Sequence, residues 1–306
     1  CGTFGSPFAL KCIDTTPSHD MTNPLLLDDT LSAFDRVRPE HIAPALDHLL
    51  KQADAALEWA VAPDMPADYD ALSAALDVPS ERLRSAWSHV CHLQAVVDTP
   101  ELRAAYNAAL PKVTELFTRH AADERLYAKY KAVSQAANQL SAPRRKALSN
   151  AMRDFVLSGA ELQGAAKQRF QELQELQAEL AQKFSEHVLD ATDSFAHYAT
   201  DEELVGVPAD VKEAARAAAQ AEGKEGHKVT LHSPSYFPVL QYSEHRALRE
   251  KLYTAHVTRA SELGDPERDN SPLMRELLKL KQEEARLLGY ANFAQVSMVP
   301  KMADSP

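Results

Sequence analysis

The sequence contains little glycine and no long apolar run. Nine of its 306 residues are glycine, against ~7% in an average protein. Because glycine supplies the positive φ angles of tight turns, its scarcity beside abundant Ala, Leu, Glu, Gln and Arg predicts long helices. No apolar run approaches ~18 residues, so no membrane-spanning helix is expected.

Cysteine and basic charge are also scarce. The three cysteines, Cys1, Cys12 and Cys91, are odd in number and follow no disulfide framework, which favours a reducing, cytoplasmic location. The formal net charge of −11 argues against nucleic acid as a partner. The basic residues 144–146 form a short cluster that we interpret as the solvated start of a helix.

The length and composition are those of a folded globular protein. A chain of 306 residues has room for two ordinary domains. A content of 45% hydrophobic and 25% charged residues is typical of a soluble globular protein. Residues 1–20 lack an initiator Met and the features of a secretion signal, so we interpret them as an unrelated, disordered leader. Residues 301–306 carry no closing feature, and both ends look cut.

Apolar residues recur every three or four positions along most of the chain, which predicts helices. Pro39, Pro100 and Pro143 lie where a first helical turn accepts proline. In residues 168–188 the predicted apolar stripe is Phe170, Leu173, Leu176, Leu180, Phe184 and Val188, typical of one arm of a helical hairpin. The predicted helices span residues 39–60, 69–76, 80–97, 100–116, 141–157, 168–188, 211–221, 243–259 and 272–288.

A small β element is predicted near residues 228–240. Residues 228–232 alternate with β-branched side chains, which favours a strand. Residues 233–240 contain two prolines and are interpreted as an extended loop that leads into a helix at Gln241. The fold class is therefore mainly α with a small β element.

Several stretches, mostly in the last third, carry a resemblance to a known family: VLDAT (188–192), ELVGVP (203–208), PSYFPV (234–239), EHRALRE (244–250), TRAS (258–261), DN (269–270), EEARLLGYANFA (283–294) and KMA (301–303). In this order they resemble the thimet oligopeptidase family of zinc metallopeptidases, and within it the oligopeptidase A-like members. The resemblance covers residues 21–306.

The resemblance implies a hydrolase: a multi-helix, two-lobed peptidase whose deep channel admits short peptides. It implies one zinc ion, held by the two histidines of a His-Glu-x-x-His pair and a later Glu, with the Glu of the pair as general base. None of the twelve histidines lies in such a pair. In the family these residues lie beyond the equivalent of Pro306. We therefore assign no catalytic, cofactor-binding or metal residue here and expect the isolated chain to be inactive.

The resemblance and the composition together predict four segments. Residues 1–20 are the leader and residues 21–157 an N-terminal helical domain. Residues 158–240 form a long helical hairpin with the β element, and residues 241–306 begin the catalytic lobe.

The richest cluster of possible metal ligands is around His89 and His92. They share a helix face, Cys91 points elsewhere, and His120 is the nearest further candidate. We expect a partly buried, hydrogen-bonded pair.

Other candidates have ordinary explanations. His227 and His232 face opposite sides of a strand, and His187 with Asp190 suggests an ion pair. Tyr236 could contact substrate from its loop, but packing is favoured. The acidic row Glu172, Glu175 and Glu179 is expected to be a solvated helix face.

Two other functions stay open beside the peptidase fragment. One is a stand-alone helical interaction module that uses residues 168–188 as a partner helix. The other is a small metal-binding protein that uses His89 and His92. A stand-alone protein should bury the helix at 272–288, whereas a fragment should expose its apolar face.

Overall fold

The computed structural model describes residues 23–27 and 31–306 and divides the chain into two compact units, residues 1–161 and 162–306. Helices dominate both units, and in the described residues the strands form a single two-stranded sheet. The predicted fold class, mainly α with a small β element, is confirmed. The expected leader, residues 1–20, lies outside the described residues.

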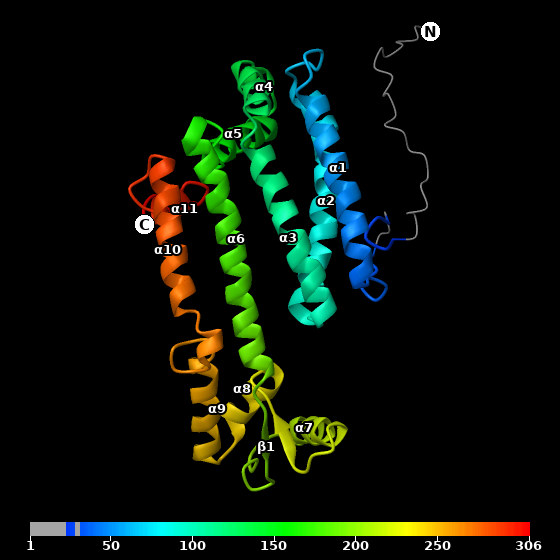
Figure 1. The fold of residues 1–306 in the computed structure, drawn as a ribbon, viewed down its shortest axis with the longest axis vertical. Coiled ribbons are helices and arrows are strands. Elements are labelled where there is room, and N and C mark those ends of the chain that lie inside the picture. Colours follow the sequence, from blue (N-terminus) through cyan, green and yellow to red (C-terminus); the bar gives the residue numbers. More distant parts are fainter. Residues whose placement is uncertain (1–22, 28–30) are drawn as a thin grey trace. The chain divides into compact units, whose positions relative to one another are not determined.

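Three long helices form most of the first unit: α1 (Pro39–Ala60), α2 (Tyr69–Val96) and α3 (Pro100–Ala121) (Figure 1). The side chains of Asp68 and Thr99 accept hydrogen bonds from backbone N–H groups in the first turns of α2 and α3, at 3.0 and 3.2 Å. These bonds satisfy donors that a helix start leaves unpaired. The predicted starts of α1 and α3 are confirmed.

The core of the first unit lies between these three helices. Trp87 of α2 stacks on Tyr106 of α3 with 4.8 Å between ring centres. The largest side chains that are almost fully buried in this cluster are Ile42, Leu46, Leu49 and Leu83.

Helix α2 corrects a prediction. Residues 69–76 and 80–97 were expected to form two helices separated at Pro79, but α2 runs through Pro79 as one helix of 28 residues. Proline removes one backbone hydrogen bond from a helix. Leu76 and Leu83, which lie two turns apart on either side of Pro79, are nevertheless buried on the same face of α2. Each belongs to an apolar cluster that includes residues of α1. Packing along α1 therefore outweighs the lost bond.

Two shorter helices, α4 (Glu124–Gln135) and α5 (Ala142–Leu157), complete the first unit. α5 matches the predicted helix ending at Leu157. α4 was not predicted, although its start signal is ordinary: the Asp123 carboxylate accepts hydrogen bonds from the N–H groups of Arg125 and Leu126, at 2.8 and 3.0 Å.

In the second unit, α6 (Gly164–Asp193) and α10 (Ser271–Leu287) lie side by side and run in opposite directions (Figure 1). The long helix at 168–188 is confirmed. Its partner is α10, which lies outside the range 158–240 where the hairpin was expected. The division of the chain at residues 157 and 240 stays a prediction.

The β element consists of β1 (His197–Ala199) and β2 (His227–Val229), which pair antiparallel with Tyr198 opposite Lys228. The expectation of an extended loop at 233–240 was wrong, because these residues lie in helix α8 (Ser233–Tyr242). Pro234 occupies the first turn, where its missing N–H has no cost. Tyr236 and Val239, one turn apart on either side of the second proline, are buried, and their packing stabilises the helix.

The remaining helices of the second unit are α7 (Ala209–Ala221), α9 (Arg246–Thr258) and α11 (Phe293–Met298). The short 3-10 turns are η1 (Ala137–Gln139) and η2 (Pro266–Arg268). The predicted helices around α7, α9 and α10 are confirmed, and α11 was not predicted. Among the described residues, no helix has the length and apolarity needed to cross a membrane.

We expect Leu46→Ala to destabilise the first unit by about 2–5 kcal/mol, the usual range for a buried leucine. Leu46 is 1% exposed in the core cluster. Both tryptophans, Trp59 and Trp87, lie in this unit, so denaturant unfolding followed by tryptophan fluorescence measures it selectively. The control Val78→Ala, at a position 65% exposed, should change stability by less than ~0.5 kcal/mol.

Candidate functional site

The histidine cluster of the first unit does not form a metal site. The rings of His89 and His92 both meet the ring of Phe34 edge-on, with centres 4.9 and 5.1 Å apart. The Nε2 of His89 lies 2.8 Å from Ser32 Oγ. His120 lies 2.8 Å from Asp54 Oδ1 instead of joining them. Within residues 23–27 and 31–306, no three His, Cys, Asp or Glu side chains are grouped to hold a metal ion.

The expected hydrogen-bonded pair is found only in part. His89 is half-buried and bonded to Ser32, whereas His92 is exposed on the same helix. Burial, and to a smaller extent the neighbouring His92, lowers the pKa of His89 below its ordinary value of 6.5. Cys91 points elsewhere, as expected, and burial raises the pKa of its thiol, which disfavours the nucleophilic thiolate form.

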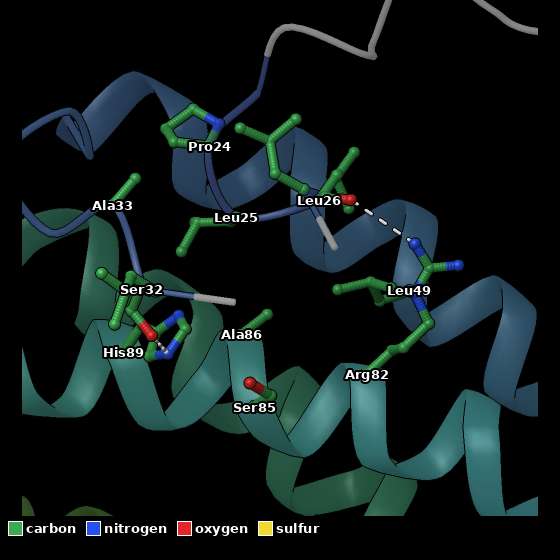
Figure 2. A pocket seen from close by; sticks show the side chains of 12 residues that line it. Pro24, Leu25, Leu26, Ser32, Ala33, Leu49, Arg82, Ser85, Ala86 and His89 are labelled. Atoms are coloured by element: carbon green, nitrogen blue, oxygen red, sulfur yellow. Dashed lines mark hydrogen bonds between the residues drawn. The ribbon is translucent and has the colours of Figure 1, made fainter. Parts of the chain in front are cut away.

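A small pocket lies beside this cluster, between residues 24–27 and 31–33 on one side and α1 and α2 on the other. Figure 2 shows Ser32 pointing to His89 on one side and Arg82 reaching the carbonyl of Leu26 on the other. Its volume is about 120 Å³, below the ~300–1,000 Å³ of ordinary ligand sites. It is too small for a peptide.

The structure also gives the positions of the other candidate residues. The Nδ1 of His187 bonds to Asn270 at 2.9 Å, and the ion pair of His187 with Asp190 stays a prediction. His227 is buried, whereas His232 is exposed and pairs with Asp193 at 2.8 Å, so the two histidines do face apart. The acidic row Glu172, Glu175 and Glu179 is exposed, as expected.

Tyr236 packs inside the second unit, as favoured, although from a helix instead of a loop. It is 3% exposed and stacks on His256 of α9 with 4.2 Å between ring centres. Its ring therefore helps to hold α8 against α9.

Three of the stretches that carry the family resemblance, VLDAT, TRAS and DN, meet at a junction between the end of α6 and the start of α10. Asn270, which is fully buried, is its centre. Its Nδ2 donates to the carbonyl of Phe184 at 3.0 Å, and its Oδ1 accepts from the ring of His187. Its backbone N–H donates to the carbonyl of Ala260 at 3.1 Å. Through its side chain and its backbone, one residue thus ties the end of α6, the segment at Ala260 and the start of α10 together.

Two arginines reinforce this junction. Arg259 donates to Thr192 Oγ1 at 3.2 Å. Arg268 donates to Ser194 Oγ at 2.7 Å and to the carbonyl of Asp190 at 3.3 Å, near the C-terminus of α6, where a cation is favourable. The junction therefore fixes where α10 begins.

A second set of bonds aligns α10 along α6. Arg169 forms a two-pronged ion pair with Glu283, at 2.7 and 3.0 Å. Deeper between the helices, Gln177 donates to the carboxylate of Glu284 at 3.0 Å, and Lys281 reaches the same oxygen at 3.2 Å. A buried carboxylate needs such partners. Sequence reasoning missed Gln177 and selected Leu176, which is 39% exposed.

The ELVGVP stretch forms a third contact. The hydroxyl of Ser243 donates to the carbonyl of Glu203 at 2.7 Å, and the N–H of Glu244 to that of Val205 at 2.8 Å. Gly206 has a φ of +89°, and a Cβ there would lie 2.3 Å from the carbonyl oxygen of Tyr242. Only glycine fits, because the α8–α9 connection passes directly over it. These three contacts build a scaffold that orients α8, α9 and α10.

Comparison with known proteins finds matches along most of the chain. A family model described as Neurolysin/Thimet oligopeptidase, N-terminal domain, matches residues 45–167, and one described as Peptidase family M3 matches residues 239–306. Oligopeptidase A of Salmonella typhimurium and of Escherichia coli are each 40% identical over 291 residues, 94% of this chain. The chain belongs to the oligopeptidase A-like M3 peptidases and corresponds to the N-terminal part of their sequence.

The match covers most of this chain but less than half of each of these relatives. The chain spans 43% of the length of the two bacterial enzymes. A probable cytosolic oligopeptidase A of Arabidopsis thaliana is 38% identical over 298 residues, which is 92% of this chain and 41% of the plant protein. Helix α10 lies in the stretch that the Peptidase family M3 model matches.

We expect Asn270→Ala to destabilise the second unit by about 1–3 kcal/mol, because it removes the buried amide that binds the Phe184 carbonyl and the His187 ring. The measurement is far-UV circular dichroism, with tryptophan fluorescence as the internal reference for the first unit. Gln168→Ala, on the exposed face of α6, should leave both signals within ~0.5 kcal/mol. Equal stability of Asn270→Ala and the parent would contradict the central role of Asn270.

We also expect the first unit to lose stability as the pH falls below 6.5. The folded-state pKa of His89 is lowered, so the unfolded chain takes up the proton first, and the loss is complete below the folded-state pKa. His89→Gln should reduce the stability difference between pH 7.5 and 5.0, measured by tryptophan fluorescence in denaturant. The control is His48→Gln, at an exposed position of α1. An unchanged difference in His89→Gln would refute this assignment.

Proposed function

We propose that the chain is the N-terminal part of a cytoplasmic, zinc-dependent oligopeptidase that hydrolyses short peptides, and that by itself it is inactive. The observation that carries this proposal is the 40% identity over 94% of the chain to enzymes that are more than twice as long. The chain contains no His-Glu-x-x-His pair. The cytoplasmic location is supported by the plant relative described as cytosolic.

In this proposal, zinc bound by the remaining part would polarise the peptide carbonyl and activate water. In the part of the chain that the structure describes, no three His, Cys, Asp or Glu side chains are grouped to hold a metal ion. The contribution of this chain is positioning, because Asn270 and Glu284 set the direction of α10 and so of the chain beyond it.

The exposure of α10 also supports a fragment. Met274 and Leu278 are 47% and 70% exposed, as expected for a helix whose second side is covered by a longer chain. The interaction-module alternative has less support, because Gln177 and Arg169 of α6 already bind α10 within the chain.

We expect the purified chain to cleave no quenched-fluorescent short peptide, with or without added zinc, while oligopeptidase A of Escherichia coli cleaves it. Cleavage by the isolated chain that a chelator abolishes would refute the proposal.

A single-chain fusion tests whether the chain can serve as the N-terminal part of an active oligopeptidase. Residues 21–306 are joined to the part of Escherichia coli oligopeptidase A that lies C-terminal to its match with this chain. We expect chelator-sensitive hydrolysis by the fusion. A fusion that folds cooperatively, takes up zinc and cleaves no peptide would count against a peptidase role for this chain.

A further inference from the structure

Helix α10 has two sides that carry apolar residues. One side faces α6, where Glu284 binds Gln177 and Leu280, one turn earlier, is 4% exposed. The other side is a second stripe, Met274, Leu278, Lys281 and Ala285, whose spacings of four, three and four place its members in one row.

Helix α11 covers only the C-terminal half of the second stripe. Ala285 is fully buried. The ammonium group of Lys281 lies 4.2 Å from the ring centre of Phe293. The amide of Gln282 donates to the carbonyl of Ala291 at 2.9 Å, which holds the loop before α11 in place. The C-terminal half of the second stripe therefore already packs against another helix, α11.

The N-terminal half of the same stripe has no such cover. Met274 is 47% exposed and Leu278 is 70% exposed. A helix normally turns a polar side to water, so two large apolar residues one turn apart are unusual there.

A second exposed patch lies on α8 and α9. Phe237, Tyr253 and Val257 are 57%, 57% and 52% exposed. Beneath Phe237, the ring of Tyr236 meets it edge-on at 5.2 Å and stacks on His256 of α9. The patch therefore rests on a packed base, so its exposure does not come from a loose loop. We call these three residues with Met274 and Leu278 the uncovered surface.

Exposed apolar side chains are concentrated in this part of the chain. Of the seventeen large hydrophobic residues that are exposed in the described residues, nine lie within residues 237–306, less than a quarter of the chain. The match to the M3 peptidase family begins at residue 239. The exposure therefore rises where the peptidase region begins.

We propose that the uncovered surface is the docking site for the C-terminal part of an M3 peptidase, the part of the relatives that this chain does not span. The chain spans 43% of the bacterial enzymes, so more than half of their length is available to cover it. Monomeric proteins rarely leave such a surface in water. The inference rests on the proposed function and names the surface through which the two parts meet.

The test uses the chain as a polypeptide separate from its partner. A tagged chain is co-expressed with the part of Escherichia coli oligopeptidase A that lies C-terminal to its match, and the complex is measured by co-purification, by light-scattering mass and by its Kd. We expect a one-to-one complex. Leu278→Glu should weaken the Kd by about tenfold or more, and Tyr253→Glu should weaken it likewise.

Val78→Glu is the matched control. Val78 is 65% exposed on α2 in the first unit, so the change introduces the same charge at a similarly exposed position. We expect its Kd to equal that of the parent. Circular dichroism checks that each variant stays folded, as it should, because all three positions are exposed.

A second measurement does not depend on substitution. Peroxide oxidises exposed methionine, and we expect Met274 to be oxidised more slowly in the complex and in the single-chain fusion than in the isolated chain.

Four outcomes would overturn the docking site: no complex, equal Kd values for Leu278→Glu and Val78→Glu, unchanged oxidation of Met274, or a dimer of this chain that Leu278→Glu abolishes. Failure of the proposed function is recognised separately, because a complex that forms through this surface and cleaves no peptide would count against the activity alone.

Discussion

The hydrogen bonds of Asn270 are the contact on which the second unit depends. A fully buried amide binds the last turns of α6 through the Phe184 carbonyl and the His187 ring, while its own backbone binds Ala260. Inside a protein, each of these bonds is costly to lose, because no water replaces it. The start of α10 is therefore held at one place relative to α6, and every contact further along α10 depends on that position.

From this junction the two helices stay aligned through contacts of different kinds. The Arg169–Glu283 pair is exposed to solvent and contributes little to stability, although its two-pronged geometry favours one register. The Gln177–Glu284 contact is buried, and a shift of one residue would leave the carboxylate without its partner. Register along α10 is thus specified by polar groups, while its apolar residues supply the packing. This leaves the second stripe free to receive another element.

Regular periodicity made much of the fold predictable. Stripes of apolar residues and ordinary start signals located α1, α3, α5, α6 and α10 within a few residues. The errors have physical causes. Pro79 and Pro238 lie inside helices because neighbouring turns are buried on both sides of them, which no local rule reports. Within α6, Leu176 was preferred to Gln177 because hydrophobicity ranks leucine first, although a buried glutamine opposite a carboxylate takes the inner position.

The candidate site was less predictable than the fold. Asn270 was visible only as half of a two-residue resemblance, and nothing near it in the sequence indicates that it would bind residues 86 and 83 positions away. His187 was paired with Asp190 because helical spacing considers only neighbours on one helix.

The sequence by itself determined the mainly helical class, the family resemblance and the absence of a His-Glu-x-x-His pair, because each depends on composition, order and local spacing. The tertiary structure decided which polar residue joins α6 to α10, that His89 and His92 form no metal site, and which side of α10 is left uncovered. These depend on contacts between residues far apart in the chain, and a helical pattern shows that a side is apolar without showing what packs against it.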